Sequence, residues 1–289
     1  MSRLLDLVAL ARPRHWLKNA FVLMPVPFAI AGGATLRPFA FALGLAAMCL
    51  AASAVYALND VVDAAQDRRH PAKKLRPVAD GRVAPGLALA FGAGLLAAAC
   101  GLAAWAGGAA ALAVIGAYAG LNGIYSLGAK NLPLVDVFLL SSGFVLRVVL
   151  GTVLLEVAPS NWLLLCSSSL ALFLALAKRR GDLVEGVDGE HRPALAGYSL
   201  GFLDQAMGIS AAITLIGYAL YTMETETLLD GREFATLPFV VFGVLEYLRL
   251  AQVRGEGASP VDVILYSPVI ALCGAGWLLA ALWSVPLPF

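Results

Sequence analysis

Long apolar stretches recur from one end of the chain to the other, and they constrain the fold more than any other feature. Each is about 20 residues long, which at ~1.5 Å per residue lets a helix cross a ~30 Å hydrocarbon core. Of the 289 residues, 60% are hydrophobic and only 13% are charged. This composition excludes an ordinary soluble globular domain and predicts a multi-pass membrane protein.

The apolar stretches are predicted to span the membrane as α-helices. They lack the alternation of a barrel strand, and in lipid every backbone polar group must be paired within its own segment. We therefore expect an all-α integral membrane protein with one transmembrane domain over residues 1–289. Nine spans are predicted, at 15–33, 38–58, 85–105, 109–126, 133–155, 160–178, 203–222, 234–250 and 262–283.

The basic residues predict the orientation of the chain. Nine spans place the termini on opposite sides of the membrane. If the N-terminus is cytoplasmic, Arg37 and Arg232 lie outside, Arg147 lies within a span, and the other 17 of the 20 Lys and Arg residues lie inside. This asymmetry follows the positive-inside rule. We therefore predict a cytoplasmic N-terminus and a C-terminus on the opposite side.

The first residues, 1–14, do not read as a secretory signal, because Asp6 interrupts the apolar run and no small-residue cleavage site follows. We interpret them as an amphipathic lead-in on the cytoplasmic surface, with Leu4, Leu5 and Val8 facing lipid.

Two long cytoplasmic loops, 59–84 and 178–202, carry clustered charge. The first begins "NDVVDAAQD", in which Asn59, Asp63 and Asp67 are spaced i, i+4, i+8 and Asp60 precedes Asp63 by three. Helical periodicity places all four on one face. Because like charges repel, a cation is expected there, and carboxylate and amide oxygens suit Mg²⁺, which usually shares its coordination with a substrate's phosphates. The pattern predicts a Mg²⁺ site, with Mn²⁺ as the alternative, and a phosphate-bearing substrate.

A basic segment, "RRHPAKKLRPVADGR", follows the acids. Pro71 and Pro77 cannot continue a helix, so the segment is predicted to form a hook over the cytoplasmic mouth of the bundle. Its cations could clamp phosphate oxygens. The alternative for this segment is an anchor for anionic lipid head groups. The alternative for the acidic face is a solvated helix end neutralised by Arg68, Arg69, Lys73 and Lys74. The candidates are Arg68, Arg69, His70, Lys73, Lys74 and Arg76.

The second charged loop opens with "KRRGDLVEG". Lys178, Asp182 and Glu185 share a face if the helix continues through Gly181. They could contact a second metal ion or a phosphate. The alternative is an ordinary stop-transfer cluster with ion pairs along the helix. Arg179 and Arg180 lie in the same cluster.

Smaller polar sets add further candidates. Asp136 and Arg147 lie three turns apart on one face of the fifth predicted span. An intramembrane Arg marks a functional site, with snorkelling toward the outer surface as the alternative. Trp16 reads as an interfacial anchor, whereas Lys18 and Asn19 could reach the site. The remaining candidates are Tyr56, Asn122, Tyr125, Ser126, Lys130 and Tyr198.

The acidic stretch resembles the NDxxDxxxD motif of the UbiA superfamily of intramembrane prenyltransferases. With "RPRHWLKN", "YSLGAKNLPLVDVFLLSSGFVLRVVLG" and "HRPALAGYS", it is similar to the decaprenyl-phosphate phosphoribosyltransferase branch over about residues 11–200. The resemblance implies a nine-helix bundle in the bacterial cytoplasmic membrane that binds Mg²⁺ and a diphosphate at its cytoplasmic face. Where the superfamily carries a second DxxxD-type motif, this chain has "KRRGDLVE", which favours a donor with an extra anionic group.

The function implied is Mg²⁺-dependent transfer of 5-phosphoribose from phosphoribosyl pyrophosphate (PRPP) to a polyprenyl phosphate, with release of diphosphate. Membrane lipids are expected partners and nucleic acid is not; homo-oligomerisation stays open. One alternative is prenyl transfer from a prenyl diphosphate to an aromatic or tetrapyrrole acceptor. Another is a transporter of an anionic metabolite, which would need polar groups deep in several spans.

Overall fold

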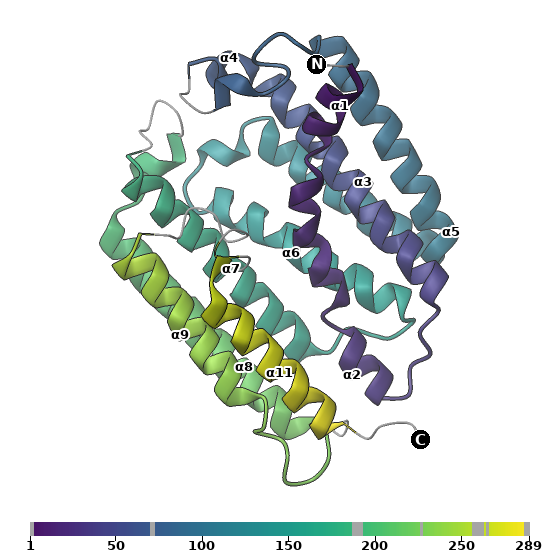
Figure 1. The fold of residues 1–289 in the computed structure, drawn as a ribbon, viewed down its shortest axis with the longest axis vertical. Helices are drawn as coiled ribbons and strands as arrows, with labels where there is room; N and C mark the ends of the chain where they lie inside the picture. The colour runs from purple at the N-terminus through teal and green to yellow at the C-terminus, as the bar shows by residue number, and fades with distance from the viewer. Residues whose placement is uncertain are drawn as a thin grey trace.

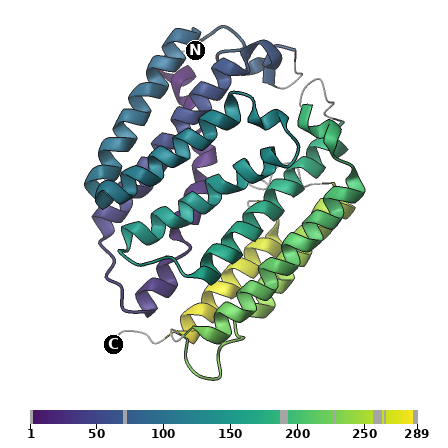
Figure 2. The ribbon, with the colours of Figure 1, turned by 180° about the vertical axis from the view of Figure 1, so that it is seen from behind.

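The computed structural model describes residues 3–69, 73–186, 193–225, 228–255, 263 and 266–285, and all regular structure in these ranges is helical. Long helices pack side by side, with α1 near one end of the bundle and the last turn of α11 near the other (Figures 1 and 2). The elements are α1 Arg3–Ala11, η1 Pro13–Leu23, α2 Val26–Ala31, α3 Pro38–Val62, α4 Ala64–Asp67, η2 Lys73–Leu75, α5 Pro85–Ser126, η3 Ala129–Asn131, α6 Val135–Leu154, α7 Asn161–Val184, η4 Pro193–Gly197, α8 Leu200–Glu224, α9 Leu237–Val253 and α11 Pro268–Ser284.

Among the described residues, five helices are long and apolar enough to cross a membrane by length and composition: α3, α5, α6, α7 and α8. Helix α5 leaves helical geometry at Gly107 and at Gly108, whose φ of +63° favours glycine. Figure 2 shows the two arms of α5 meeting at this corner. The break falls between the predicted spans 85–105 and 109–126. The predicted all-α fold is therefore confirmed, while the count of nine spans stays a prediction.

The first predicted span, 15–33, is not one continuous α-helix. It divides into the 3₁₀ segment η1 and the short helix α2. Pro25 and Pro27 explain the division, because proline cannot donate the backbone hydrogen bond that a continuous helix requires. The segment η1 packs closely on α6, where a Cβ added at Gly151 would lie only 2.2 Å from the carbonyl oxygen of Val22.

Contacts between loops and helix ends connect elements that lie far apart in the sequence. At one end of the bundle, Arg37 pairs with Glu156, and Arg232 donates to the carbonyl oxygen of Trp283. At the opposite end, Arg82 pairs with Asp6. Leu4, Leu5 and Val8 of α1 are exposed, which is consistent with the predicted apolar face of the lead-in, although Asp6 itself is buried.

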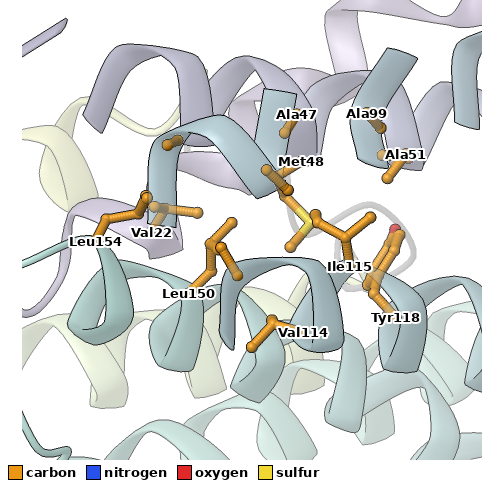
Figure 3. Close-up of a cluster of buried hydrophobic side chains, with 14 of the residues drawn as sticks. Val22, Ala47, Met48, Ala51, Ala99, Val114, Ile115, Tyr118, Leu150 and Leu154 are labelled. Atoms are coloured by element: carbon orange, nitrogen blue, oxygen red, sulfur yellow. The ribbon is translucent and has the colours of Figure 1, made fainter. Parts of the chain in front are cut away.

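Three apolar clusters are found among the described residues, and the two largest join most of the long helices. The first joins α3, α5, α6 and η1 around Met48, Ile115 and Leu150, which are fully buried (Figure 3). Small side chains such as Ala47 and Ala51 allow α3 and α5 to approach closely, as is usual between helices in lipid. The second cluster joins α7, α8 and α9. The tight contact between α3 and α5 fixes the end of α3, where the acidic motif lies.

Candidate active site

The acidic face predicted from the sequence begins in the last turn of α3 and continues into α4. Only Asp63 separates the two helices, and its φ of −88° and ψ of −2° stay in the right-handed region, so the direction of the helix is nearly kept. Asp60 and Asp67 are close neighbours, because Nη1 of Arg76 lies 3.5 Å from Asp60 Oδ1 and 2.6 Å from Asp67 Oδ2. Asp60 is 1% exposed and Asp67 is 4% exposed.

Three cations from three different parts of the chain meet these carboxylates. Arg12, which precedes η1, contacts Asp60; Arg76, in the basic hook, bridges Asp60 and Asp67; and Lys130, on η3, contacts Asp63. The sequence alternative named Arg68, Arg69, Lys73 and Lys74 as the neutralising residues. The structure adds Arg12 and Lys130, which lie far from the acids in sequence, and Arg76 from the same loop.

Arg12 was not predicted as a site residue. It adopts a left-handed backbone conformation, with a φ of 52°, and its guanidinium lies 5.0 Å from the centre of the Tyr56 ring. Burial and the nearby charge of Arg76 lower the pKa of Arg12 below its usual value. Tyr56 lies one turn before Asp60 on α3, and its hydroxyl is 3.2 Å from His15 Nδ1. Arg12 lies in the motif "RPRHWLKN", which the sequence analysis singled out. Helical periodicity within this motif cannot show that the Arg12 side chain contacts Asp60 on another helix.

The basic hook folds back on the site as predicted. Arg68 Nε donates to the carbonyl oxygen of Ala79, and Arg82 Nη2 donates to that of Leu75, so side chains fix the turns of the hook. Lys73 is half-buried and Lys74 is exposed. The predicted phosphate ligand His70 lies outside the described residues.

The donor chemistry of the acidic face fits a hard divalent cation. Asp60 Oδ2 is buried and has no hydrogen-bond partner, which leaves a carboxylate oxygen available as a ligand. The amide oxygen of Asn59 accepts a hydrogen bond from Ser126. Among the described residues, no three His, Cys, Asp or Glu side chains already form a metal-holding group. Mg²⁺ binding by Asn59, Asp60, Asp63 and Asp67 therefore stays a prediction, and it requires the paired cations to shift toward a bound anion.

Ion pairs along and between helices involve the start of the second charged loop, as in the alternative interpretation of this segment. Helix α7 does continue through Gly181, but Arg179 is fully buried and is bound by Asp136, Asp182 (2.8 Å) and the Tyr125 hydroxyl (3.2 Å). Asp136 of α6 and Tyr125 of α5 therefore tie Arg179 to the neighbouring helices, and its contact with a donor phosphate stays a prediction. Asp182 faces Arg179, while Glu185 is exposed at the end of α7 and Lys178 is half-buried.

Arg180 points away from the acidic face. It donates from Nε to Asp204 at 2.6 Å and from Nη1 to the carbonyl oxygen of Ala251 at 2.7 Å, which ties α7 to α8 and α9. The neighbouring helices supply these partners, and the phosphate contact of Arg180 stays a prediction.

Tyr198 connects to the same buried network. Its hydroxyl donates to Asp136 Oδ1 at 2.5 Å. Burial and this hydrogen bond raise the pKa of Tyr198 above its usual value, so the hydroxyl remains a donor at neutral pH.

Arg147 and Asn19 form a second buried polar cluster, below the acidic face. Arg147 Nε donates to Asn19 Oδ1 at 2.7 Å, and Nη2 donates to the Tyr118 hydroxyl at 3.0 Å. Arg147 is 4% exposed, so it does not snorkel toward the outer surface. Asn19 is fully buried and its amide nitrogen also donates to Cys49 Sγ, while its contact with donor phosphate stays a prediction. Lys18 is half-buried, and the amide of Asn122 donates to the carbonyl oxygen of Tyr118.

An apolar cavity of about 580 Å³ lies between η1, α2, α7, α8, α9 and α11. Its walls are aliphatic and aromatic, and its size falls within the range of small-molecule sites. No local pattern could have predicted it, because six elements line it. Representative lining residues are Phe28, Phe173, Tyr218, Gly274 and Trp277.

The described residues thus form an apolar helical bundle with charged side chains gathered at helix ends and an apolar cavity between the helices. The sequence matches the UbiA prenyltransferase family over residues 20–250. The chain belongs to this family and is a transferase.

Relatives and solved structures agree with this assignment. The chain is 31% identical to a decaprenyl-phosphate phosphoribosyltransferase of Corynebacterium glutamicum, over 95% of this chain and 85% of that protein. It is also 31% identical to a protein of the same name from Mycobacterium tuberculosis, over 92% and 90%. The fold matches a UbiA homologue from Archaeoglobus fulgidus bound to GPP and Mg²⁺, with a TM-score of 0.74 and 19% identity, over 96% of this chain and 97% of that chain.

Proposed function

We propose that this protein transfers 5-phosphoribose from PRPP to a polyprenyl phosphate at the cytoplasmic face of a bacterial membrane and releases diphosphate. Relatives that carry the name decaprenyl-phosphate phosphoribosyltransferase match nearly the whole chain at about 30% identity, which supports this substrate pair. The strong excess of basic residues on one predicted side supports the cytoplasmic location.

The observation that carries the proposal is the meeting of three carboxylates and three cations at one end of the bundle. Asn59, Asp60, Asp63 and Asp67 would hold Mg²⁺, or Mn²⁺ in its place. A bound divalent ion supplies charge stabilisation for the departing diphosphate. Arg12, Arg76 and Lys130 already lie against the carboxylates, so small side-chain movements bring them to phosphate oxygens.

The proposed chemistry requires no general base from the protein. The acceptor phosphate is anionic at neutral pH, so its oxygen attacks C1 of the ribose directly while the bond from C1 to the diphosphate oxygen breaks. The cations offset the charge that develops on the leaving group. The apolar cavity beside η1 offers a site for part of the isoprenoid chain.

A second candidate is prenyl transfer from a prenyl diphosphate to an aromatic or tetrapyrrole acceptor. Archaeoglobus fulgidus homologues of the same fold have been solved with GPP and Mg²⁺ and with DMAPP and Mg²⁺. The same metal-binding face could serve either donor, so the substrate must be decided by experiment.

Purified protein should be incubated in lipid or detergent with Mg²⁺, PRPP and a polyprenyl phosphate, and the lipid fraction analysed by mass spectrometry. The proposal expects a phosphoribosylated polyprenyl phosphate and stoichiometric diphosphate. A parallel reaction contains a prenyl diphosphate and an aromatic acid. Product only in the parallel reaction would transfer the assignment to the second candidate.

A further inference from the structure

The turn that carries Lys130 to the acidic face has an unusual backbone. It comprises residues 127–134, between α5 and α6. Gly128 has a φ of +144° and Leu134 a φ of +66°. The value at Leu134 is strained for a residue with a branched side chain, so the surrounding structure must hold it in place.

Tyr198 supplies the first of these restraints. The backbone N–H of Leu134 donates to the Tyr198 hydroxyl at 2.6 Å, and that hydroxyl donates in turn to Asp136 Oδ1 at 2.5 Å. The other oxygen of Asp136 accepts from Arg179. A single phenol therefore connects the strained backbone of the turn to a buried ion pair between α6 and α7.

Gly197 supplies the second restraint, independently of any hydrogen bond. It ends η4, which packs directly on the turn. A Cβ added at Gly197 would lie 2.3 Å from Cγ of Pro133, closer than real Cβ contacts come. Only glycine at this position lets η4 approach the turn so closely, and any larger residue must push the two segments apart.

We propose that Gly197 and Tyr198 are positioning residues that hold the 127–134 turn so that Lys130 stays against Asp63 and is available to the donor's phosphates. The role of Lys130 rests on the proposed function. Lys130 contacts Asp63, and its side chain is only 14% exposed, so its path to the acidic face is set by the packed turn. Displacement of the turn by about 1 Å would misplace the ammonium group relative to the donor. Residues in the second charged loop, 178–202, thus act on the acidic face of the first charged loop.

Two substitutions remove the two restraints on the 127–134 turn, and a third serves as a control. Tyr198→Phe removes the bridging hydroxyl, and Gly197→Ala introduces the forbidden Cβ. Gly201→Ala is the matched control: it lies four residues beyond Gly197, where a Cβ would meet no atom within 4 Å. The first measurement is hydrogen exchange by mass spectrometry on peptides that contain residues 127–134, which needs no substrate. Exchange in these peptides should rise about tenfold in both test variants and stay unchanged in the control.

The second measurement separates positioning from general structural damage. Tyr198→Phe should lower kcat/KM for PRPP about tenfold, mainly through KM. If Tyr198 acts through Lys130, the double variant Lys130→Ala/Tyr198→Phe should be no worse than Lys130→Ala alone, because the group being positioned is already gone. A structural role would instead give multiplied losses in the double variant.

Unchanged exchange in the turn, or multiplied losses in the double variant, would overturn the positioning role. If the wild-type protein uses a prenyl diphosphate and not PRPP, the proposed function fails by itself. The same double-variant comparison is then made with prenyl diphosphate as the donor. A failure of the proposed function can therefore be distinguished from a failure of the positioning role.

Discussion

The guanidinium of Arg12 contacts the carboxylate of Asp60, which lies 48 residues further along the chain. This contact joins the segment before η1 to the end of α3 and leaves the second oxygen of Asp60 buried without a partner. A guanidinium and a divalent ion compete for one carboxylate unless an anion lies between them. Under the proposed function, this pair would couple the binding of the donor to the binding of the metal.

Replacement of Arg12 by Gln should strengthen the binding of Mg²⁺ and weaken the binding of the donor. Removal of a positive charge beside Asp60 should tighten Mg²⁺ binding without donor by roughly threefold to tenfold. Loss of a phosphate-binding cation should raise the KM for PRPP about tenfold. Isothermal titration and steady-state kinetics measure the two effects. Arg14→Gln is the control, because Arg14 Nη2 donates to the hydroxyl of Tyr266, 3.1 Å away, which is not a residue of the acidic face. Weaker Mg²⁺ binding in Arg12→Gln would contradict the coupling.

Asp63→Asn should lower turnover by about 10²-fold or more while the protein stays folded, because a carboxylate ligand of the metal is lost. Chelation of divalent ions should abolish activity in the wild-type protein, and added Mg²⁺ or Mn²⁺ should restore it. Asp80→Asn provides the comparison, because Asp80 is exposed and pairs with Arg82 in the hook. Activity near the wild-type level in Asp63→Asn would remove the support for the metal site.

Arg147→Lys should destabilise the protein by about 1–3 kcal/mol, because an ammonium cannot satisfy both Asn19 and Tyr118 in the fork geometry of a guanidinium. Thermal unfolding in detergent measures the loss. Arg37→Lys changes an exposed pair with Glu156 and should cost at most about 1 kcal/mol. Equal losses of stability in Arg147→Lys and Arg37→Lys would show that the buried cluster around Arg147 does not stabilise the protein more than the exposed pair.

Gly151→Ala should loosen the contact of η1 with α6. The added Cβ would lie 2.2 Å from the Val22 carbonyl oxygen, and overpacking of this kind costs about 1–3 kcal/mol. The control is Gly116→Ala, where a Cβ meets no atom within 4 Å and where alanine favours a helix. We expect a lower melting temperature for Gly151→Ala only. A similar decrease in Gly116→Ala would contradict the close packing of η1 on α6.

A bulky residue in the apolar cavity should impair use of the lipid acceptor alone. Gly274 lines the cavity, and a Cβ there has no neighbour within 4 Å, so Gly274→Phe adds a ring beside this space. The KM for polyprenyl phosphate should rise about tenfold, while Mg²⁺ and PRPP binding stay unchanged. Gly94→Phe, on an open surface of α5, is the matched control. An unchanged acceptor KM in Gly274→Phe would exclude the cavity as the acceptor site.

Several features of this protein follow from the sequence because they depend on neighbours along the chain. Apolar stretches long enough to span a membrane predict the helices, and paired glycines at 107 and 108 coincide with the corner in α5. The i, i+4, i+8 spacing of Asn59, Asp63 and Asp67 places them on one face whatever surrounds the helix. Pro25 and Pro27 explain the broken first span, although the apolar pattern alone predicted it as continuous.

The tertiary structure decided which side chains meet across the bundle. Local periodicity could not select Arg12 and Lys130 as partners of the acids, bury Arg179 with Asp136, or assign Asn19 to Arg147. It also could not reveal the apolar cavity. These contacts join elements far apart in sequence, and they depend on how closely the helices pack and how far each side chain reaches. Helical periodicity fixes where a side chain lies around its own axis, whereas only packing fixes what lies opposite it.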